Sequence, residues 1–125
     1  MDGGRQMADE TVLGFIGGSG IYAVDRMEEV RLEAVETPWG RPSGPVVAGV
    51  LNGVRVLFLP RHGAGHVVPP SEVNYRANIA ALKMLGATDV ISVSACGSFR
   101  EHLSPGTFVI VDQFIDRTHA RAKSF

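Results

Sequence analysis

Three glycine-rich turns, each directly after a short apolar run, constrain this chain more than any other feature. The turns span residues 17–20, 61–65 and 95–98, and glycine makes up 15 of the 125 residues, against an average of about 7%. Apolar runs of about four to eight residues that end in glycine are typical of buried strands entering tight turns. The runs at 12–16 and 89–95 therefore predict strands with turns open to a ligand, because glycine lets a ligand approach the backbone closely.

A β-hairpin is predicted in the middle of the chain. Residues 46–51 and 54–59 are apolar and flank Asn52-Gly53, a pair that favours the type I′ turn of a two-residue hairpin loop. We expect these two strands to be antiparallel. Before them, residues 30–35 alternate apolar and polar side chains, which predicts a half-buried strand.

Segment 71–85 has the period of an amphipathic helix. Ser71 is the expected N-cap, Lys83 suits the last turn, and Gly86 is the expected left-handed stop. The predicted apolar face consists of Val73, Ala77, Ala81 and Leu85, widened by Ile79, Leu82 and Met84.

Beyond the helix, residues 104–107 (Ser-Pro-Gly-Thr) predict a type II turn, followed by an apolar strand at 108–115. The whole pattern predicts an α/β fold, a mixed twisted sheet with helical cover. Ligands of such sheets bind at the carboxyl ends of the strands. The three glycine turns are therefore expected to meet at one edge.

Composition limits the class of protein. There are 12 basic and 13 acidic residues, a net charge of −1, which argues against binding to nucleic acid or to an anionic membrane. Cys96 is the only cysteine and no window resembles a signal peptide or a membrane helix, so a cytoplasmic setting is expected. The length suits one domain, with residues 1–10 flexible and 11–125 folded.

The side chains of the three turns share a chemistry. Ser19 and Ser94 offer hydroxyls, Arg61 a planar fork of N–H donors, and His62 an imidazole, beside several backbone N–H groups. Together these groups would surround one tetrahedral oxyanion, and phosphate is the natural candidate. Taken singly, each turn also has an ordinary explanation as a surface loop.

Three other chemistries are less well supported. Gly18-x-Gly20-x-x-Ala23 formally matches a dinucleotide-binding fingerprint, but a poorly helical segment follows it. His62 and His66 have the spacing of zinc ligands, but intervening glycines disfavour a helix and no metal is expected. Cys96 could act as a nucleophile with a histidine base, although a free cysteine at a strand end is more often a small buried apolar group.

Five segments in order carry a resemblance: GGSG, RHG, NYRANI, ACGS and DQFIDRT. From about residue 12 to the end, the chain resembles the trimeric purine nucleoside phosphorylase family, in particular the members that act on S-methyl-5′-thioadenosine. The resemblance implies phosphorolysis, in which inorganic phosphate attacks the anomeric carbon and releases adenine and 5-methylthioribose 1-phosphate. It implies no metal or organic cofactor, with phosphate as a substrate, and a homotrimer as the assembly.

The resemblance also assigns residues. Positions that match the phosphate-binding groups of the family are Ser19, Arg61, His62, Ser94 and Ala95, the last through its backbone N–H. His66 matches a position close to the ribose or its 5′ substituent.

Members of the family are considerably longer. By resemblance, the remainder carries the purine pocket, including an aspartate that binds N7 of the leaving base, and neither Asp112 nor Asp116 matches that residue. We therefore expect residues 11–125 to be the amino-terminal portion of a single phosphorylase domain, with no catalytic residue of its own and little or no activity alone. Two alternatives stay open: a 6-oxopurine nucleoside or methylthioinosine phosphorylase, and an inactive phosphate-binding fragment.

Overall fold

The computed structural model describes residues 10–18 and 26–125. The chain divides into two compact units, Met1–Ser94 and Ala95–Phe125, and each is described by itself. The described helices and strands all lie in the first unit. The prediction of a flexible segment at 1–10 falls almost wholly outside the described residues, and that of a single domain stays a prediction.

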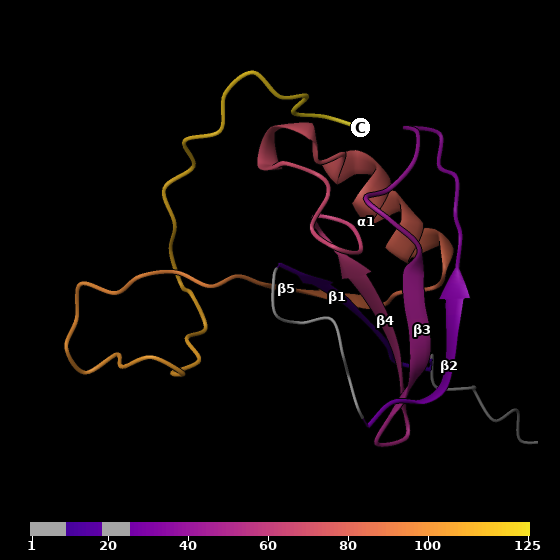
Figure 1. Ribbon diagram of the computed structural model, residues 1–125, viewed down its shortest axis with the longest axis horizontal. Coiled ribbons are helices and arrows are strands. Elements are labelled where there is room, and N and C mark those ends of the chain that lie inside the picture. Colours follow the sequence, from indigo (N-terminus) through magenta and orange to yellow (C-terminus); the bar gives the residue numbers. More distant parts are fainter. Residues whose placement is uncertain (1–9, 19–25) are drawn as a thin grey trace, which may run out of the picture. The chain divides into compact units, whose positions relative to one another are not determined.

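The first unit is built on one five-stranded sheet with the order β2-β3-β4-β1-β5 (Figure 1). The strands are β1 (Val12–Gly17), β2 (Glu28–Glu33), β3 (Val46–Leu51), β4 (Val54–Pro60) and β5 (Asp89–Val93). Strand β1 is parallel to both β4 and β5, whereas β3 is antiparallel to β2 and β4. The predicted mixed sheet is confirmed.

The predicted hairpin joins β3 to β4. Leu51 pairs with Val54 across the turn, and the two turn residues, Asn52 and Gly53, have φ values of 49° and 78°. Two successive positive φ values are what a type I′ turn requires, and asparagine and glycine adopt them at least cost. This turn fixes the register of β4 against β3. It thereby sets the position of Arg61, the residue that follows β4.

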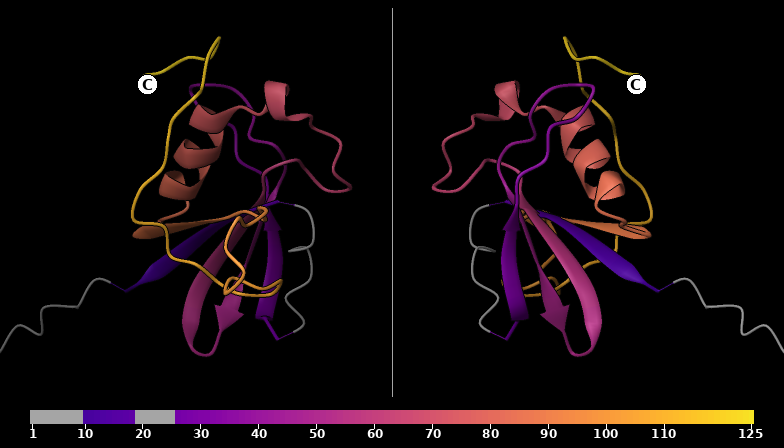
Figure 2. Two further views of the ribbon diagram at one scale, coloured as in Figure 1. Left: turned by 90° about the vertical axis from the view of Figure 1, so that its left-hand side faces the viewer. Right: turned by 90° about the vertical axis from the view of Figure 1, so that its right-hand side faces the viewer.

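Helix α1 (Tyr75–Met84) lies over one face of the sheet (Figure 2). Ala81 and Leu82 are fully buried against the strands. Gly14 of β1 permits this close approach, because a Cβ atom there would lie 3.2 Å from Leu82 Cδ1. The sheet side of the core consists of Val12, Ile16, Val46, Ala48, Leu57 and Leu59.

Helix α1 begins later than predicted. Val73 is extended and Asn74 is the N-cap, its Oδ1 accepting a hydrogen bond from the Ala77 N–H at 3.1 Å, whereas Ser71 falls in a 3₁₀ turn (Pro70–Glu72). Asn74 rather than Ser71 is the N-cap, because its side-chain oxygen satisfies a backbone donor that would otherwise lack a partner. Gly86 has a φ of 93°, as predicted for the stop.

The apolar face of α1 is narrower than predicted. Leu82 is buried, but Ile79 and Met84 are 40% and 58% exposed. The buried residues of the helix are Ala77, Asn78, Ala80, Ala81 and Leu82, so Ile79 and Met84 do not widen the buried face.

The burial expected for residues 30–35 is wrong. A strand forms there as β2, but Val30 and Leu32 are 56% and 70% exposed. Strand β2 is the edge strand next to β3, and its pairing shifts between Glu28 and Arg31. An edge strand with a bulge twists away from the helix layer, so alternation in its sequence does not lead to burial.

The second unit contains the predicted turn but no strand. Thr107 N–H donates to Ser104 O at 3.1 Å and Gly106 has a φ of 89°, as a type II turn requires. Residues 108–115, however, have no regular structure. A β-strand needs a partner edge for its backbone groups, and within this unit none pairs with them. Cys96 is exposed, so the expectation of a buried thiol is also wrong.

No helix among residues 10–18 and 26–125 is long and apolar enough to cross a membrane.

Candidate functional site

The carboxyl ends of three adjacent parallel strands form one edge of the sheet. Gly17, the last residue of β1, pairs with Pro60 of β4 on one side and with Val93 of β5 on the other. The next residues along each strand, Gly18, Arg61 and Ser94, therefore start from the same edge. The three strand ends meet at one edge, as predicted, whereas the third turn, residues 95–98, belongs to the second unit, so the convergence of all three turns stays a prediction.

Arg61 and Ser94 are in direct contact across this edge. Arg61 Nη1 donates a hydrogen bond to Ser94 Oγ at 3.1 Å, although the two residues are 33 positions apart. The Arg61 backbone is held too, because its N–H donates to Gly17 O at 2.8 Å. The guanidinium thus lies over β1 between the ends of β4 and β5.

Gly18 allows the guanidinium to take this position. A Cβ atom at Gly18 would lie 2.8 Å from Arg61 Nη2, closer than real Cβ atoms come to other atoms. Gly18 of the first turn therefore allows the side chain of Arg61, from the second turn, to come close to the backbone.

Arg61 forms no ion pair with a carboxylate within residues 10–18 and 26–125. A guanidinium has five N–H donors, and the Ser94 hydroxyl is a neutral partner. Among the described residues no carboxylate neutralises this guanidinium, and a guanidinium with unused donors is able to grip an anion through two parallel hydrogen bonds.

His62 is buried, 8% exposed, and its ring is oriented by the loop. Its Nδ1 lies 2.9 Å from Val68 O, and the Val68 N–H donates back to His62 O at 2.8 Å. A carbonyl only accepts, so Nδ1 carries the proton. Nε2 is left for a ligand: it accepts from a protonated oxyanion when the ring is neutral and donates when the ring is charged.

His66 lies beside His62, with ring centroids 4.4 Å apart. Its φ is 58°, and Gly63 and Gly65 have φ values of 75° and 76°, so the turn is not helical, as the glycines predicted. No group of three histidine, cysteine, aspartate or glutamate side chains suited to a metal occurs in the part of the chain that the structure describes.

For two predicted phosphate-binding residues, Ser19 and Ala95, the assignment stays a prediction. Ser19 lies outside the described residues, as do Gly20 and Ala23 of the dinucleotide fingerprint. Ala95 is the first residue of the second unit.

Asp116 takes part in a turn of the second unit. Its Oδ1 accepts from the Thr118 N–H at 2.8 Å. The hydrogen bond of the Thr118 side chain, and then that of its backbone, lower the pKa of the Asp116 carboxyl from its ordinary value, because they favour the charged form.

Sequence reasoning missed a buried support behind the second turn. Asn78 of α1 is 1% exposed and bonds to Ser43, whose carbonyl lies against Gly63. The available signal was the pair Asn74 and Asn78, two amides one helical turn apart in a segment otherwise patterned for burial.

A mixed sheet covered by a helix, with an arginine, a serine and a histidine at the carboxyl ends of parallel strands, defines an α/β protein whose ligand site is expected at this edge. The family model for the phosphorylase superfamily matches residues 12–125, and the chain belongs to this superfamily.

Individual relatives are more specific. The chain is 63% identical over 116 residues to S-methyl-5′-thioadenosine phosphorylase of Cereibacter sphaeroides, covering 93% of this chain, and 56% identical to the enzyme of that name from Bradyrhizobium diazoefficiens. Methylthioadenosine phosphorylase from Schistosoma mansoni, solved in its apo form, superimposes with a TM-score of 0.85 at 47% identity over 93% of this chain and 41% of that one. The same protein in complex with tubercidin gives a TM-score of 0.81 at 49% identity, over 90% of this chain and 39% of that one.

The chain spans about 40% of the length of the relatives it matches, 40% of both the Cereibacter and the Bradyrhizobium proteins.

Proposed function

We propose that this chain supplies the phosphate-binding part of an enzyme that cleaves S-methyl-5′-thioadenosine by phosphorolysis. The observation that carries the proposal is the contact between Arg61 and Ser94 at the shared edge of β4, β1 and β5. Among the described residues Arg61 has no carboxylate partner, and such a cation beside a hydroxyl and a buried, oriented imidazole suits a phosphate. Ser19 and the Ala95 N–H are proposed to complete the set.

In the proposed reaction, a phosphate oxygen attacks the anomeric carbon of the ribose. The bond from that carbon to N9 of adenine breaks and its electron pair stays on the base. The base takes up a proton, in net balance the one that the attacking hydrogen phosphate gives up. The products are adenine and 5-methylthioribose 1-phosphate. The residues of this chain bind and orient the nucleophile, and such positioning lowers the barrier because the bound phosphate has already lost its freedom of motion.

Adenosine is the second candidate substrate. Solved relatives are named adenosine/methylthioadenosine phosphorylase, which favours 6-aminopurine nucleosides over 6-oxopurine ones. A homotrimeric assembly, a cytoplasmic location and the absence of any metal or organic cofactor remain part of the proposal.

Phosphate titration of the chain tests the anion site. We expect Arg61→Ala to weaken phosphate binding by about 2–4 kcal/mol, since a charge-assisted two-pronged contact is lost. The matched control is Arg55→Ala, which removes an arginine from the other end of β4 and is expected to leave phosphate affinity unchanged. Isothermal titration calorimetry with inorganic phosphate measures both variants. Equal phosphate affinity in the wild type and Arg61→Ala would contradict the assignment.

A further inference from the structure

Asn78 is a fully buried amide whose two ends both bond to one residue of a distant loop. Its Oδ1 accepts from the Ser43 N–H at 2.8 Å, and its Nδ2 donates to Ser43 Oγ at 3.0 Å. With 1% of its surface exposed, Asn78 has no water to replace these bonds, so their loss would leave buried polar groups unpaired. The amide therefore fixes both the backbone and the side chain of Ser43.

Ser43 in turn lies against the turn that carries Arg61 and His62. A Cβ atom at Gly63 would lie 2.9 Å from Ser43 O, and Gly63 has a φ of 75°. From the other side, a Cβ atom at Gly44 would lie 3.7 Å from Gly63 Cα. The backbone of residues 43 and 44 thus packs directly on the residue that follows His62, with no side chain between them.

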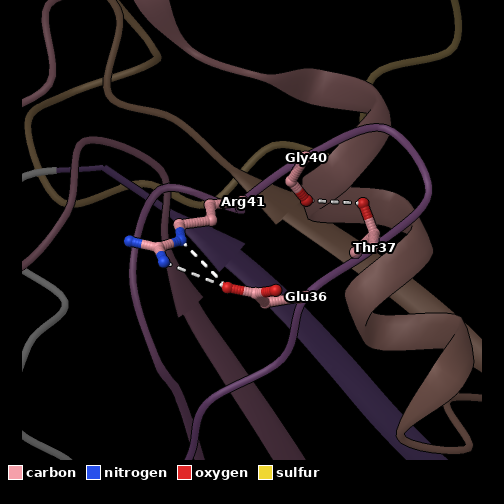
Figure 3. Close-up of polar contacts among 4 residues, drawn as sticks. All are labelled: Glu36, Thr37, Gly40 and Arg41. Carbon is pink, nitrogen blue, oxygen red and sulfur yellow. Dashed lines mark hydrogen bonds and ion pairs between the residues drawn. The ribbon is translucent and has the colours of Figure 1, made fainter.

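The loop that ends at Ser43 is braced before it reaches this point. Thr37 and Gly40 exchange backbone hydrogen bonds of 3.1 and 2.9 Å. Thr37 Oγ1 also donates to Gly40 O at 2.7 Å, and Arg41 pairs with Glu36 (Figure 3).

Helix α1 binds the same loop at a second residue. Asn74, one turn before Asn78 on α1, donates to Trp39 O at 2.8 Å. Helix α1 therefore holds the loop at two points, and at the Asn78 point the loop lies against the turn at Gly63.

We infer that Asn78 is a positioning residue for phosphate, acting through Ser43 on the turn that bears Arg61 and His62; this rests on the proposed function. The turn is held on one side by the Arg61 N–H bond to Gly17 O. Asn78 and Ser43 supply the backing on the other side. Without that backing the guanidinium and the imidazole sample more positions, and fewer of these fit a phosphate.

Phosphate titration of the full chain and its variants tests this inference. We expect Asn78→Ala to weaken binding of inorganic phosphate by about five- to tenfold, and Ser43→Ala, which removes only the hydroxyl, by about two- to threefold. Both substitutions act through one contact. Ser43→Ala should therefore weaken phosphate binding less in the Asn78→Ala background than it does in the wild type. The matched control is Asn74→Ala, which loses the bond to Trp39 and the helix cap but leaves Ser43 in place, and should lower the urea midpoint without changing phosphate affinity.

The outcomes separate the two proposals. Suppose that Arg61→Ala abolishes phosphate binding while Asn78→Ala and Ser43→Ala leave it unchanged. This result would overturn the positioning role of Asn78 and leave the proposed function standing. Equal loss of phosphate affinity in Asn78→Ala and Asn74→Ala would also overturn it, since the effect would then be general destabilisation. If Asn78→Ala fails to fold, the Ser43→Ala variant decides, through its phosphate affinity and the NMR amide resonance of Gly63. An unmoved Gly63 resonance together with unchanged phosphate affinity would overturn the positioning role of Asn78. No phosphate binding by the wild-type chain would overturn the proposed function and this inference with it.

Discussion

At the scale of single residues, two glycines shape the candidate anion site, because a Cβ atom at either position would crowd a neighbouring group. Gly18 lets the Arg61 guanidinium cross β1, and Gly63 lets the Ser43 carbonyl meet the second turn. Neither role is visible from the neighbours of these glycines in the sequence. The role of Gly18 predicts a loss of phosphate affinity without a loss of stability.

Gly18→Ala should weaken phosphate binding without unfolding the chain. The new Cβ would lie 2.8 Å from Arg61 Nη2, the far end of a flexible side chain, so the guanidinium moves aside at little cost in stability. We expect phosphate affinity to fall by about fivefold, or about 1 kcal/mol, with the midpoint of urea unfolding unchanged. Calorimetry and urea titration measure the two quantities, and a large drop in the urea midpoint would show that the backbone at Gly18, and not the guanidinium, has moved.

The carboxyl of Asp116 should titrate below the ordinary range of an aspartate. Its pKa is lowered chiefly by the Thr118 hydroxyl, so Thr118→Val should raise the pKa of Asp116 part of the way back, while Thr118→Ser should leave it low. Because the folded-state pKa is lowered, any stabilisation of the turn is present above the unfolded pKa and is lost as the pH falls through the folded one. An NMR pH titration of the Asp116 side chain measures the shift, and identical curves for all three proteins would refute this explanation.

At the scale of elements, α1 packs on β1 and β4 through a small number of side chains. Leu82 is fully buried over Gly14, while Met84 of the same helix is 58% exposed. The contribution of the helix to stability therefore depends on a few side chains that meet the sheet.

Leu82→Ala should destabilise the first unit by about 2–5 kcal/mol, because it leaves a cavity between the helix and β1. Met84→Ala, its control on the exposed side, should change the free energy of unfolding by less than about 0.5 kcal/mol. Urea unfolding followed by circular dichroism measures both. Similar losses in the two variants would mean that α1 does not pack on the sheet as described.

At the scale of the whole molecule, the chain belongs to a superfamily of phosphorylases and matches about 40% of the length of its relatives. The second unit exposes large apolar side chains, among them Phe108, Ile110 and Ile115, which are 92%, 99% and 88% exposed. Exposed apolar surface of this kind favours association with other protein surfaces.

The 125-residue chain alone should not phosphorolyse S-methyl-5′-thioadenosine, since we propose that it contributes only the phosphate-binding part. Joined to the part of the Cereibacter sphaeroides relative that it does not match, it should do so, because the chain is 63% identical to the segment that it would replace. Release of adenine, followed by chromatography, measures the reaction. The same fusion carrying Arg61→Ala is the control, and native rates from the unfused chain would contradict the prediction.

The sequence by itself determined the features that depend on neighbouring residues. The Asn52-Gly53 hairpin, the turn at 104–107, the stop at Gly86 and the end of β1 each follow from local backbone preferences, and five short motifs carry the resemblance to the superfamily. The strand predicted for 89–95 is shorter, since β5 ends at Val93. Which residues meet was decided only by the tertiary structure. The bond from Arg61 to Ser94 spans 33 positions and that from Asn78 to Ser43 spans 35, and both exist because parallel pairing and helix packing bring distant segments together. The exposed β2 and the missing strand at 108–115 have the same cause, since an apolar pattern is buried or paired only where another element lies against it.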